Sequence, residues 1–155
     1  MKKNIRGFTL IELLLVIIIL GILAALIMGN ISNSLKKGRD ARRKADLNQI
    51  RSALEIYYED KGAYPSTISF DQPLTDADTG KIYIKRVPDD PLSVSSYTYY
   101  YCVSTDYQSY QLYAFLENSQ DPQIITPAPL ANCVDFNCGT GIDCNYGTST
   151  PNTTP

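Results

Sequence analysis

The feature that most constrains the fold is an unbroken apolar run near the N-terminus. From Phe8 to Met28 the only residues that interrupt it are Thr9, Glu12 and Gly21. A helix rises about 1.5 Å per residue, so a run of this length reaches across a hydrocarbon core of about 30 Å. The run predicts a transmembrane helix, because a cleaved secretory signal has a shorter apolar region of about 7 to 15 residues that ends in small residues.

The helix is expected to continue past the apolar run. No proline occurs between residues 8 and 61, and the segment 29–62 combines an apolar stripe with a charged face. Gly62 is placed to end the helix, because the C′ position commonly needs a positive φ. The stripe consists of Leu47, Ile50, Leu54, Tyr57 and Tyr58. Three pairs of opposite charge are spaced to meet along the helix: Arg42 with Asp46, Asp40 with Lys44, and Arg51 with Glu55.

After Pro65 the sequence changes to short runs separated by turn residues. Residues 97–117 are rich in tyrosine and β-branched residues, with a polar turn around 104–109, and this pattern predicts an antiparallel hairpin. The second run alternates, so one of its faces is expected to cover the stripe of the helix. That second run places Tyr110, Leu112, Ala114 and Leu116 on one face and Gln111, Tyr113 and Phe115 on the other.

The connector between helix and hairpin is expected to consist mainly of loops. Asp76, Asp78 and Gly80 resemble the start of a calcium loop, but the glycine at position six and the distal glutamate of an EF-hand are missing. We therefore expect solvated turn acids there and no metal site. The sequence "PDDP" at 88–91 predicts a rigid corner.

The cysteines indicate disulfides outside the cytoplasm. All four of them, Cys102, Cys133, Cys138 and Cys144, lie in the last third of the chain. Zinc is disfavoured because the spacing has no CxxC pair and the chain has no histidine. Basic residues on both sides of the apolar run leave its orientation open, so the cysteines decide that the N-terminus is cytoplasmic. We expect one bridge from Cys102 to the tail, with its partner left open.

The composition argues against catalysis. Histidine, the commonest general base near neutral pH, is absent, and the Ser, Thr and Asp residues form no recognisable triad or metal cluster. The net charge of −2 gives no reason to expect nucleic acid as a direct partner. No catalytic residue, cofactor or metal is expected.

Glu12 needs an explanation, because an acid inside an apolar run is costly. A charged carboxylate at the centre of a membrane helix costs about 2.5 to 3.5 kcal/mol on insertion scales, so such residues usually have a partner and a function. No basic residue lies within one turn of Glu12 inside the run. The partner is therefore expected to come from elsewhere.

The sequence "RGFTLIELLLVIIILGILAALI" resembles the processing signal of type IV pilins and type II secretion pseudopilins. In that family a prepilin peptidase cuts after the glycine of a short basic leader, and the new N-terminal residue is N-methylated. The resemblance implies cleavage between Gly7 and Phe8 and methylation of Phe8. It also implies that Glu12 serves in assembly, by pairing with the Phe8 amine of a neighbouring subunit.

The resemblance implies an α+β, pilin-like fold: a long N-terminal helix, transmembrane and then amphipathic, on a small antiparallel β-sheet head with a disulfide-linked tail. The helix exit, the corner and the late hairpin resemble G-type major pseudopilins over about two thirds of the chain. The calcium loop of many G-type pseudopilins has no evident counterpart. The expected parts are a leader at 1–7, a transmembrane half-helix at 8–28, an amphipathic half-helix at 29–62, a head at 63–146 and a flexible tail at 147–155.

The resemblance implies a structural subunit of a type IV pilus-like or type II secretion pseudopilus filament. Its implied partners are identical or related pilin subunits, the prepilin peptidase and methyltransferase, and an inner-membrane assembly platform with its ATPase. The subunit would be a single-pass membrane protein with its head outside the cytoplasm before it enters a periplasmic or extracellular filament. The alternative is a membrane-anchored adhesin or binding module that does not polymerise, for which Glu12 would be dispensable.

Overall fold

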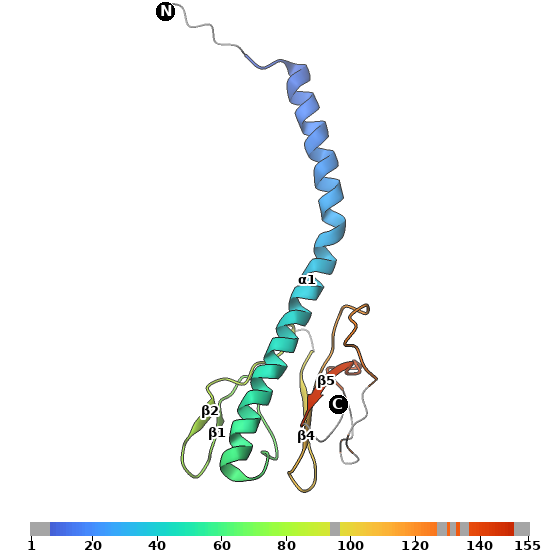
Figure 1. The fold of residues 1–155 in the computed structure, drawn as a ribbon. Helices are drawn as coiled ribbons and strands as arrows, with labels where there is room; N and C mark the ends of the chain where they lie inside the picture. Colours follow the sequence, from blue (N-terminus) through green and yellow to red (C-terminus); the bar gives the residue numbers. More distant parts are fainter. Residues whose placement is uncertain (1–6, 94–96, 127–129, 131–132, 134–136, 151–155) are drawn as a thin grey trace, which may run out of the picture. The chain divides into compact units, whose positions relative to one another are not determined.

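The computed structural model describes residues 7–93, 97–126, 130, 133 and 137–150, except for the side chains of 26–30. The chain divides into two compact units, Met1–Lys36 and Lys37–Pro155. A long N-terminal helix and a small antiparallel sheet confirm the predicted α+β, pilin-like fold (Figure 1). The elements are α1 (Leu10–Lys61), β1 (Leu74–Thr75), β2 (Ile82–Ile84), β3 (Tyr100–Val103), β4 (Tyr110–Ala114) and β5 (Tyr146–Ser149).

Helix α1 is continuous, as its lack of proline predicts. Gly62 ends it with a φ of 68°, and the Gly62 N–H donates to the Tyr58 carbonyl at 2.7 Å. In the first unit, the described side chains from 7 to 25 and from 31 to 35 are all exposed. Among the described side chains, the structure contains no helix that is both long and apolar enough to cross a membrane.

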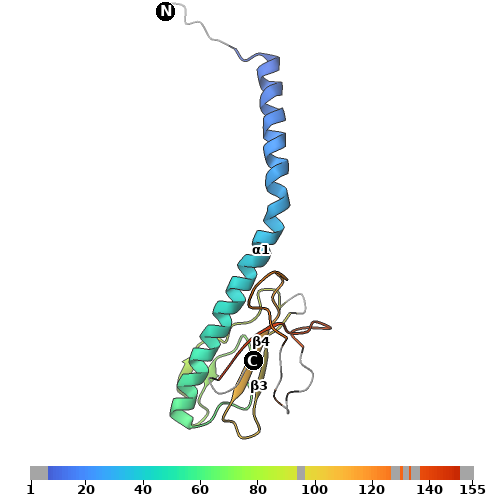
Figure 2. The ribbon, with the colours of Figure 1, turned by 45° about the vertical axis from the view of Figure 1, so that its right-hand side comes forward.

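Strands β3 and β4 form the predicted hairpin. Their antiparallel register places Tyr100 opposite Tyr113 and Val103 opposite Tyr110. The Ser104 N–H donates to the Ser109 carbonyl at 2.8 Å and closes the turn. Figure 2 shows the two strands side by side.

The main core of the second unit lies between the amphipathic part of α1 and one face of β4. Leu47, Ile50 and Leu54 from the helix are buried, as the stripe predicts. The sheet contributes Tyr110, Leu112 and Ala114 to the same cluster. The expectation that one face of the second hairpin run would cover the helix is confirmed, and the structure shows that it is the face of Tyr110, Leu112 and Ala114.

The connector has more structure than expected. Strands β1 and β2 pair antiparallel, with Leu74 opposite Ile84. The predicted turn lies between them, and Asp76 there is buried rather than solvated. The Lys61 ammonium lies 2.8 Å from an Asp76 carboxylate oxygen and 3.1 Å from one of Asp78. The expectation of solvated acids was wrong for Asp76, because a lysine from the helix end neutralises it.

The C-terminal region also differs from the prediction. Residues 147–149, which were expected in a flexible tail, belong to β5, and β5 pairs antiparallel with β4. Backbone pairing at the β4 edge thus orders a sequence that has few apolar side chains of its own. Residues 151–155 of the predicted tail lie outside the described residues, as do residues 1–6 of the predicted leader.

The structure pairs the cysteines as Cys102 with Cys133 and Cys138 with Cys144. The first bridge joins β3 to the C-terminal region, which is the connection expected of Cys102. The second closes a short loop whose two cysteines are both buried. Neither pairing could be read from the spacing of the cysteines.

Candidate functional site

The first candidate site is the start of α1, where Glu12 has a partner within its own chain. One Glu12 carboxylate oxygen, Oε2, accepts hydrogen bonds from the Thr9 N–H and from the Thr9 hydroxyl, both at 2.8 Å. The Glu12 N–H donates back to Thr9 Oγ1 at 3.3 Å. This reciprocal arrangement is a capping box, which satisfies amide groups that the first helical turn leaves without partners.

The capping box changes the interpretation of Glu12. The sequence argument treated the acid as lacking any local partner, whereas the structure supplies two donors from Thr9. Among the described residues no cation is paired with Glu12, so its charge is hydrogen-bonded but not neutralised. The signal was readable in the sequence, because Thr-x-x-Glu before an apolar run is the signature of a capping box.

The predicted processing residues lie just before this cap. Gly7 and Phe8 precede the first residue of α1, and the Phe8 side chain is 84% exposed. A Cβ on Gly7 would meet no atom within 4 Å, so the fold itself does not require a glycine at this position. Among the described residues, no packing contact explains the glycine.

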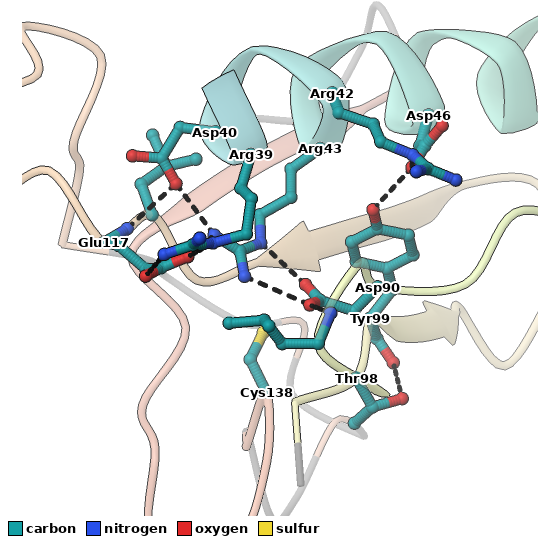
Figure 3. Close-up of polar contacts among 12 residues, drawn as sticks. Arg39, Asp40, Arg42, Arg43, Asp46, Asp90, Thr98, Tyr99, Glu117 and Cys138 are labelled. Carbon is teal, nitrogen blue, oxygen red and sulfur yellow. Dashed lines mark hydrogen bonds and ion pairs between the residues drawn. The ribbon is translucent and has the colours of Figure 1, made fainter. Parts of the chain in front are cut away.

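The second candidate site is a buried cluster of charges in the second unit, centred on Arg43 (Figure 3). The Arg43 side chain is 0% exposed and contacts three carboxylates. Its Nη1 donates to Asp40 Oδ1 at 2.8 Å and to Glu117 Oε1 at 2.7 Å. Its Nε and Nη2 donate to the two oxygens of Asp90. One helical side chain thus joins two loops that are distant in the sequence.

The neighbours of Arg43 complete the cluster. Arg39 donates to both oxygens of Glu117, from Nε at 2.7 Å and from Nη2 at 2.6 Å. The two oxygens of Asp40 accept the backbone N–H groups of Glu117 and Asn118, each at 2.9 Å. The carboxylates therefore bind both guanidinium groups and loop amides, which leaves few of their lone pairs unused.

The cluster perturbs the acidity of its members. Hydrogen bonds from Arg39, and then from Arg43, lower the pKa of Glu117 to about 2 against the opposing effect of burial. Burial disfavours the charge of Arg43, but the hydrogen bonds that it donates to Asp90 and Glu117 outweigh this effect and raise the pKa of the guanidinium. Both shifts favour the charged forms of Glu117 and Arg43, as a buried ion pair needs.

The periodicity of the helix could have revealed this cluster. Arg43 lies four residues before Leu47 and Asp40 lies seven before it, so both fall on the apolar stripe. A charged residue at such a position must find partners inside the fold. The sequence argument assigned Asp40 to Lys44 instead, and this pairing is wrong, because Lys44 pairs with Asp121 at 2.7 Å.

Of the other two predicted helix pairs, the structure forms the pair of Arg42 with Asp46. Arg42 and Asp46 form the expected contact, with nitrogen and oxygen 3.8 Å apart. Glu55 instead accepts a hydrogen bond from the Tyr64 hydroxyl at 3.0 Å. Tertiary partners thus compete with the spacing of four residues along the helix.

A polar hollow lies beside the cluster. It has a volume of about 460 Å³ and is lined by residues that include Asp46, Arg42, Asp89 and Asp90. Asp46 accepts the Tyr99 hydroxyl at 2.8 Å, and burial raises the pKa of its carboxyl group. The acids and arginines that line this hollow are largely paired with each other.

These arrangements are ion pairs and hydrogen bonds that join the elements of the second unit. Among the described residues no group of three or more cysteine, aspartate or glutamate side chains is placed to hold a metal ion. The Arg43 cluster instead joins residues 39–46 of α1 to the loops at 88–92 and 117–121. The cluster thereby fixes these two loops to the same segment of the helix.

Comparison with known proteins places these features in a family. The family model described as the prokaryotic N-terminal methylation motif matches residues 2–28. A second family model, described as type II secretion system, protein G, matches residues 30–122, which is more than half of the chain. The first match contains Gly7, Phe8 and the capping box, and the second contains the Arg43 cluster and the β3–β4 hairpin.

Curated relatives agree with these matches. The type II secretion system core protein G of Aeromonas hydrophila is 35% identical over 101 residues, which is 58% of this chain and 69% of the relative. The core protein G of Pseudomonas aeruginosa is 37% identical over 99 residues, covering 58% of this chain and 70% of the relative. No solved structure matches the chain. On the strength of the family model and these relatives, the chain belongs to the type II secretion system protein G family.

Proposed function

We propose that this chain is a structural subunit of a pseudopilus, the helical filament of a type II secretion system. The observation that carries the proposal is the exposed apolar surface of the first unit of the chain. Every described side chain from 7 to 25 is exposed, and most of them are large and apolar. Such a surface must be covered by lipid or by other helices, because apolar surface of this extent is not stable in water.

Processing prepares the subunit for assembly. A prepilin peptidase cleaves between Gly7 and Phe8 and the new Phe8 amine is methylated, as the motif at residues 2–28 supports. Residues 8–28, which include side chains that the structure does not describe, hold the subunit in the inner membrane before assembly. The head follows outside the cytoplasm, where its two disulfides are stable.

Assembly uses the charge of Glu12. Thr9 occupies Oε2 of the Glu12 carboxylate, and no hydrogen bond to Oε1 is formed among the described residues. The Phe8 amine of a neighbouring subunit supplies the missing cation, so that both charges are neutralised where water is scarce. The helices of many copies form the filament core, and an assembly platform with its ATPase drives extrusion. The protein has no catalytic role of its own in this proposal.

The test combines mass analysis with filament assembly. Intact mass and N-terminal analysis are measured for the protein from cells that contain a prepilin peptidase, with Gly7→Ala beside the natural chain. We expect the natural chain to begin at N-methylated Phe8 and the variant to keep its leader, since the peptidase is expected to cut after Gly7. An added Cβ at this position meets no described atom within 4 Å, so the substitution should not disturb the fold. A natural chain that keeps residues 1–7 would overturn the proposal.

A second variant tests assembly separately from processing. Glu12→Gln keeps the side chain's size and can still accept hydrogen bonds from Thr9, but it removes the charge. We expect the processed variant to accumulate in the membrane without forming filaments. Filaments of normal yield from the variant would show that assembly does not use this charge. An anchored module that does not polymerise would form no filaments from either the natural chain or the variant.

A further inference from the structure

The chain continues beyond the part that the protein G family model matches. We call its described residues after 122, namely 123–126, 130, 133 and 137–150, the C-terminal extension. We propose that the C-terminal extension is a redox-gated clasp on the sheet. Its two disulfides hold it closed, and their reduction releases β5 from β4 while the rest of the head stays folded.

The first argument is that the two faces of the sheet have separate cores. The core between α1 and the sheet is built from buried residues between 47 and 114, all of which lie before the extension. The opposite face has a smaller core of Tyr113, Cys138 and Cys144, against which Tyr100 and Phe115 pack. From the extension only the partly buried Tyr146 packs against the helix-facing core, whereas the second core contains both Cys138 and Cys144. Loss of the extension therefore removes the second core and leaves every buried residue of the helix-facing core in place.

The second argument is that the extension covers the hairpin through specific polar contacts. Strand β5 pairs with four residues of β4, from Gln111 opposite Ser149 to Ala114 opposite Tyr146. Asn145 fastens the start of this strand, since its side chain accepts from the Leu116 N–H at 2.6 Å and donates to the Leu116 carbonyl at 3.0 Å. The extension therefore closes an edge of β4 that would otherwise present unpaired backbone groups.

The third argument is that the extension has little apolar surface with which to hold itself. Strand β5 contains Tyr146, Gly147, Thr148 and Ser149, and strands of this length are only marginally stable by pairing alone. Gly147 lies under the Tyr113 ring, where an added Cβ would come within 2.3 Å of the ring. The contact between Gly147 and the Tyr113 ring is close but covers little area. In this proposal, the pairing of β5 with β4 therefore depends on a covalent constraint.

The two disulfides supply that constraint, and both lie before β5 in the chain. Cys133 is joined to Cys102 in β3, so the extension has a covalent link to the sheet at this residue. Cys138 is joined to Cys144, directly before Asn145 and β5, and the Cys138 carbonyl accepts the Thr98 N–H at 3.0 Å. A disulfide favours the closed state mainly by removing the freedom of the open one.

The chemistry of closing is thiol–disulfide exchange. For each bridge, two cysteine thiols become one disulfide while the disulfide of an extracytoplasmic oxidoreductase is reduced to a dithiol, and a small dithiol reverses the reaction. The clasp closes only after the head has left the reducing cytoplasm. The consequence for filaments, that β4 is closed before subunits meet, rests on the proposed function.

Amide hydrogen exchange on the full-length chain in detergent tests the clasp. The oxidised protein is compared with the same protein in dithiothreitol, and the variant with all four cysteines changed to serine is the control for the reductant itself. We expect reduction to speed exchange at 146–149 by roughly tenfold or more, with residues 43–54 of α1 unchanged. Unchanged protection of β5 would overturn the proposal, and so would simultaneous loss of protection in β5 and α1.

Two further variants keep the test independent of the cysteine chemistry. Gly147→Ala pushes β5 away from the Tyr113 ring with both disulfides intact, whereas Gly38→Ala adds a methyl group where no atom lies within 4 Å. We expect Gly147→Ala to lose protection of β5 chiefly after reduction, and Gly38→Ala to behave like the natural chain. If Gly147→Ala in dithiothreitol keeps β5 protected, the clasp does not exist. Because these measurements need no filament, their failure is distinct from failure of the proposed function.

Discussion

The guanidinium of Arg43 donates to both carboxylate oxygens of Asp90, from Nε to Oδ2 at 2.7 Å and from Nη2 to Oδ1 at 3.1 Å. Both side chains are almost completely buried. A bidentate pair of this kind has directional bonds as well as charge, so it fixes the corner at 88–91 against the helix. Asp90 also accepts the Leu92 N–H at 2.7 Å, which extends the constraint into the loop.

Removing Arg43 should strongly destabilise the head. Arg43→Met keeps much of the side chain's volume but leaves Asp90, Asp40 and Glu117 with fewer donors inside the protein. We expect the free energy of unfolding to fall by about 3–5 kcal/mol, as when one partner of a buried ion pair is removed. Denaturant unfolding of the full-length chain in detergent measures the change.

Arg42→Met is the matched control for this prediction. The Arg42 side chain is 67% exposed, and its contact with Asp46 is long. The free energy of unfolding should therefore change by no more than about 0.5 kcal/mol. Equal effects of the two substitutions would contradict the central role of Arg43.

Acid should weaken the head through Glu117. Its folded-state pKa of about 2 lies below its ordinary value of 4.5, because Arg39 and Arg43 stabilise the charged form. A lowered pKa means that the stabilisation is complete above about pH 4.5 and is lost as the pH falls toward 2. In unfolding experiments across this window, Glu117→Gln should flatten the pH dependence and lower stability by about 1–3 kcal/mol at neutral pH. If the free energy of unfolding changes with pH equally in the natural chain and the variant, other acids cause the loss of stability in acid.

The Thr9 cap should control the first turn of α1. Thr9→Val removes the hydroxyl that bonds to Glu12 while keeping the branched shape, and Thr9→Ser keeps the hydroxyl. Loss of a capping side chain costs about 1 kcal/mol, so amides 10–13 of the valine variant should exchange faster in detergent. The serine variant should match the natural chain, and faster exchange in both variants would point away from the hydroxyl.

Lys61 should set the acidity of Asp76. The Lys61 ammonium, helped by the Thr79 hydroxyl and the Asp78 N–H, lowers the pKa of the Asp76 carboxyl group. Lys61→Met should therefore raise that pKa, and NMR titration of the Asp76 side chain measures the shift. Lys85→Met changes an exposed lysine elsewhere in the connector and should leave the titration of Asp76 unaltered. If both variants titrate like the natural chain, Lys61 is not the cause.

Local patterns in the sequence were sufficient to predict the long helix and the hairpin. The absence of proline, the apolar stripe and Gly62 predict α1 to its last turn, because each acts within a few residues along the chain. The hairpin at 100–114 follows from two alternating runs and the turn between them. The Thr9–Glu12 cap was equally local, and its signature was present but not used.

The sequence by itself thus determined the processing motif, the helix and the central hairpin, whose interactions join residues close along the chain. Only the tertiary structure decided the partners of Arg43, the pairing of Cys102 with Cys133, and the use of 146–149 as a third strand. Asp90 lies 47 residues from Arg43 and Glu117 lies 74 residues away, and no local period specifies which distant acid meets a buried cation. That choice is made when the packing of α1 on the sheet brings the loops together, since a buried charge is stable only where such partners converge.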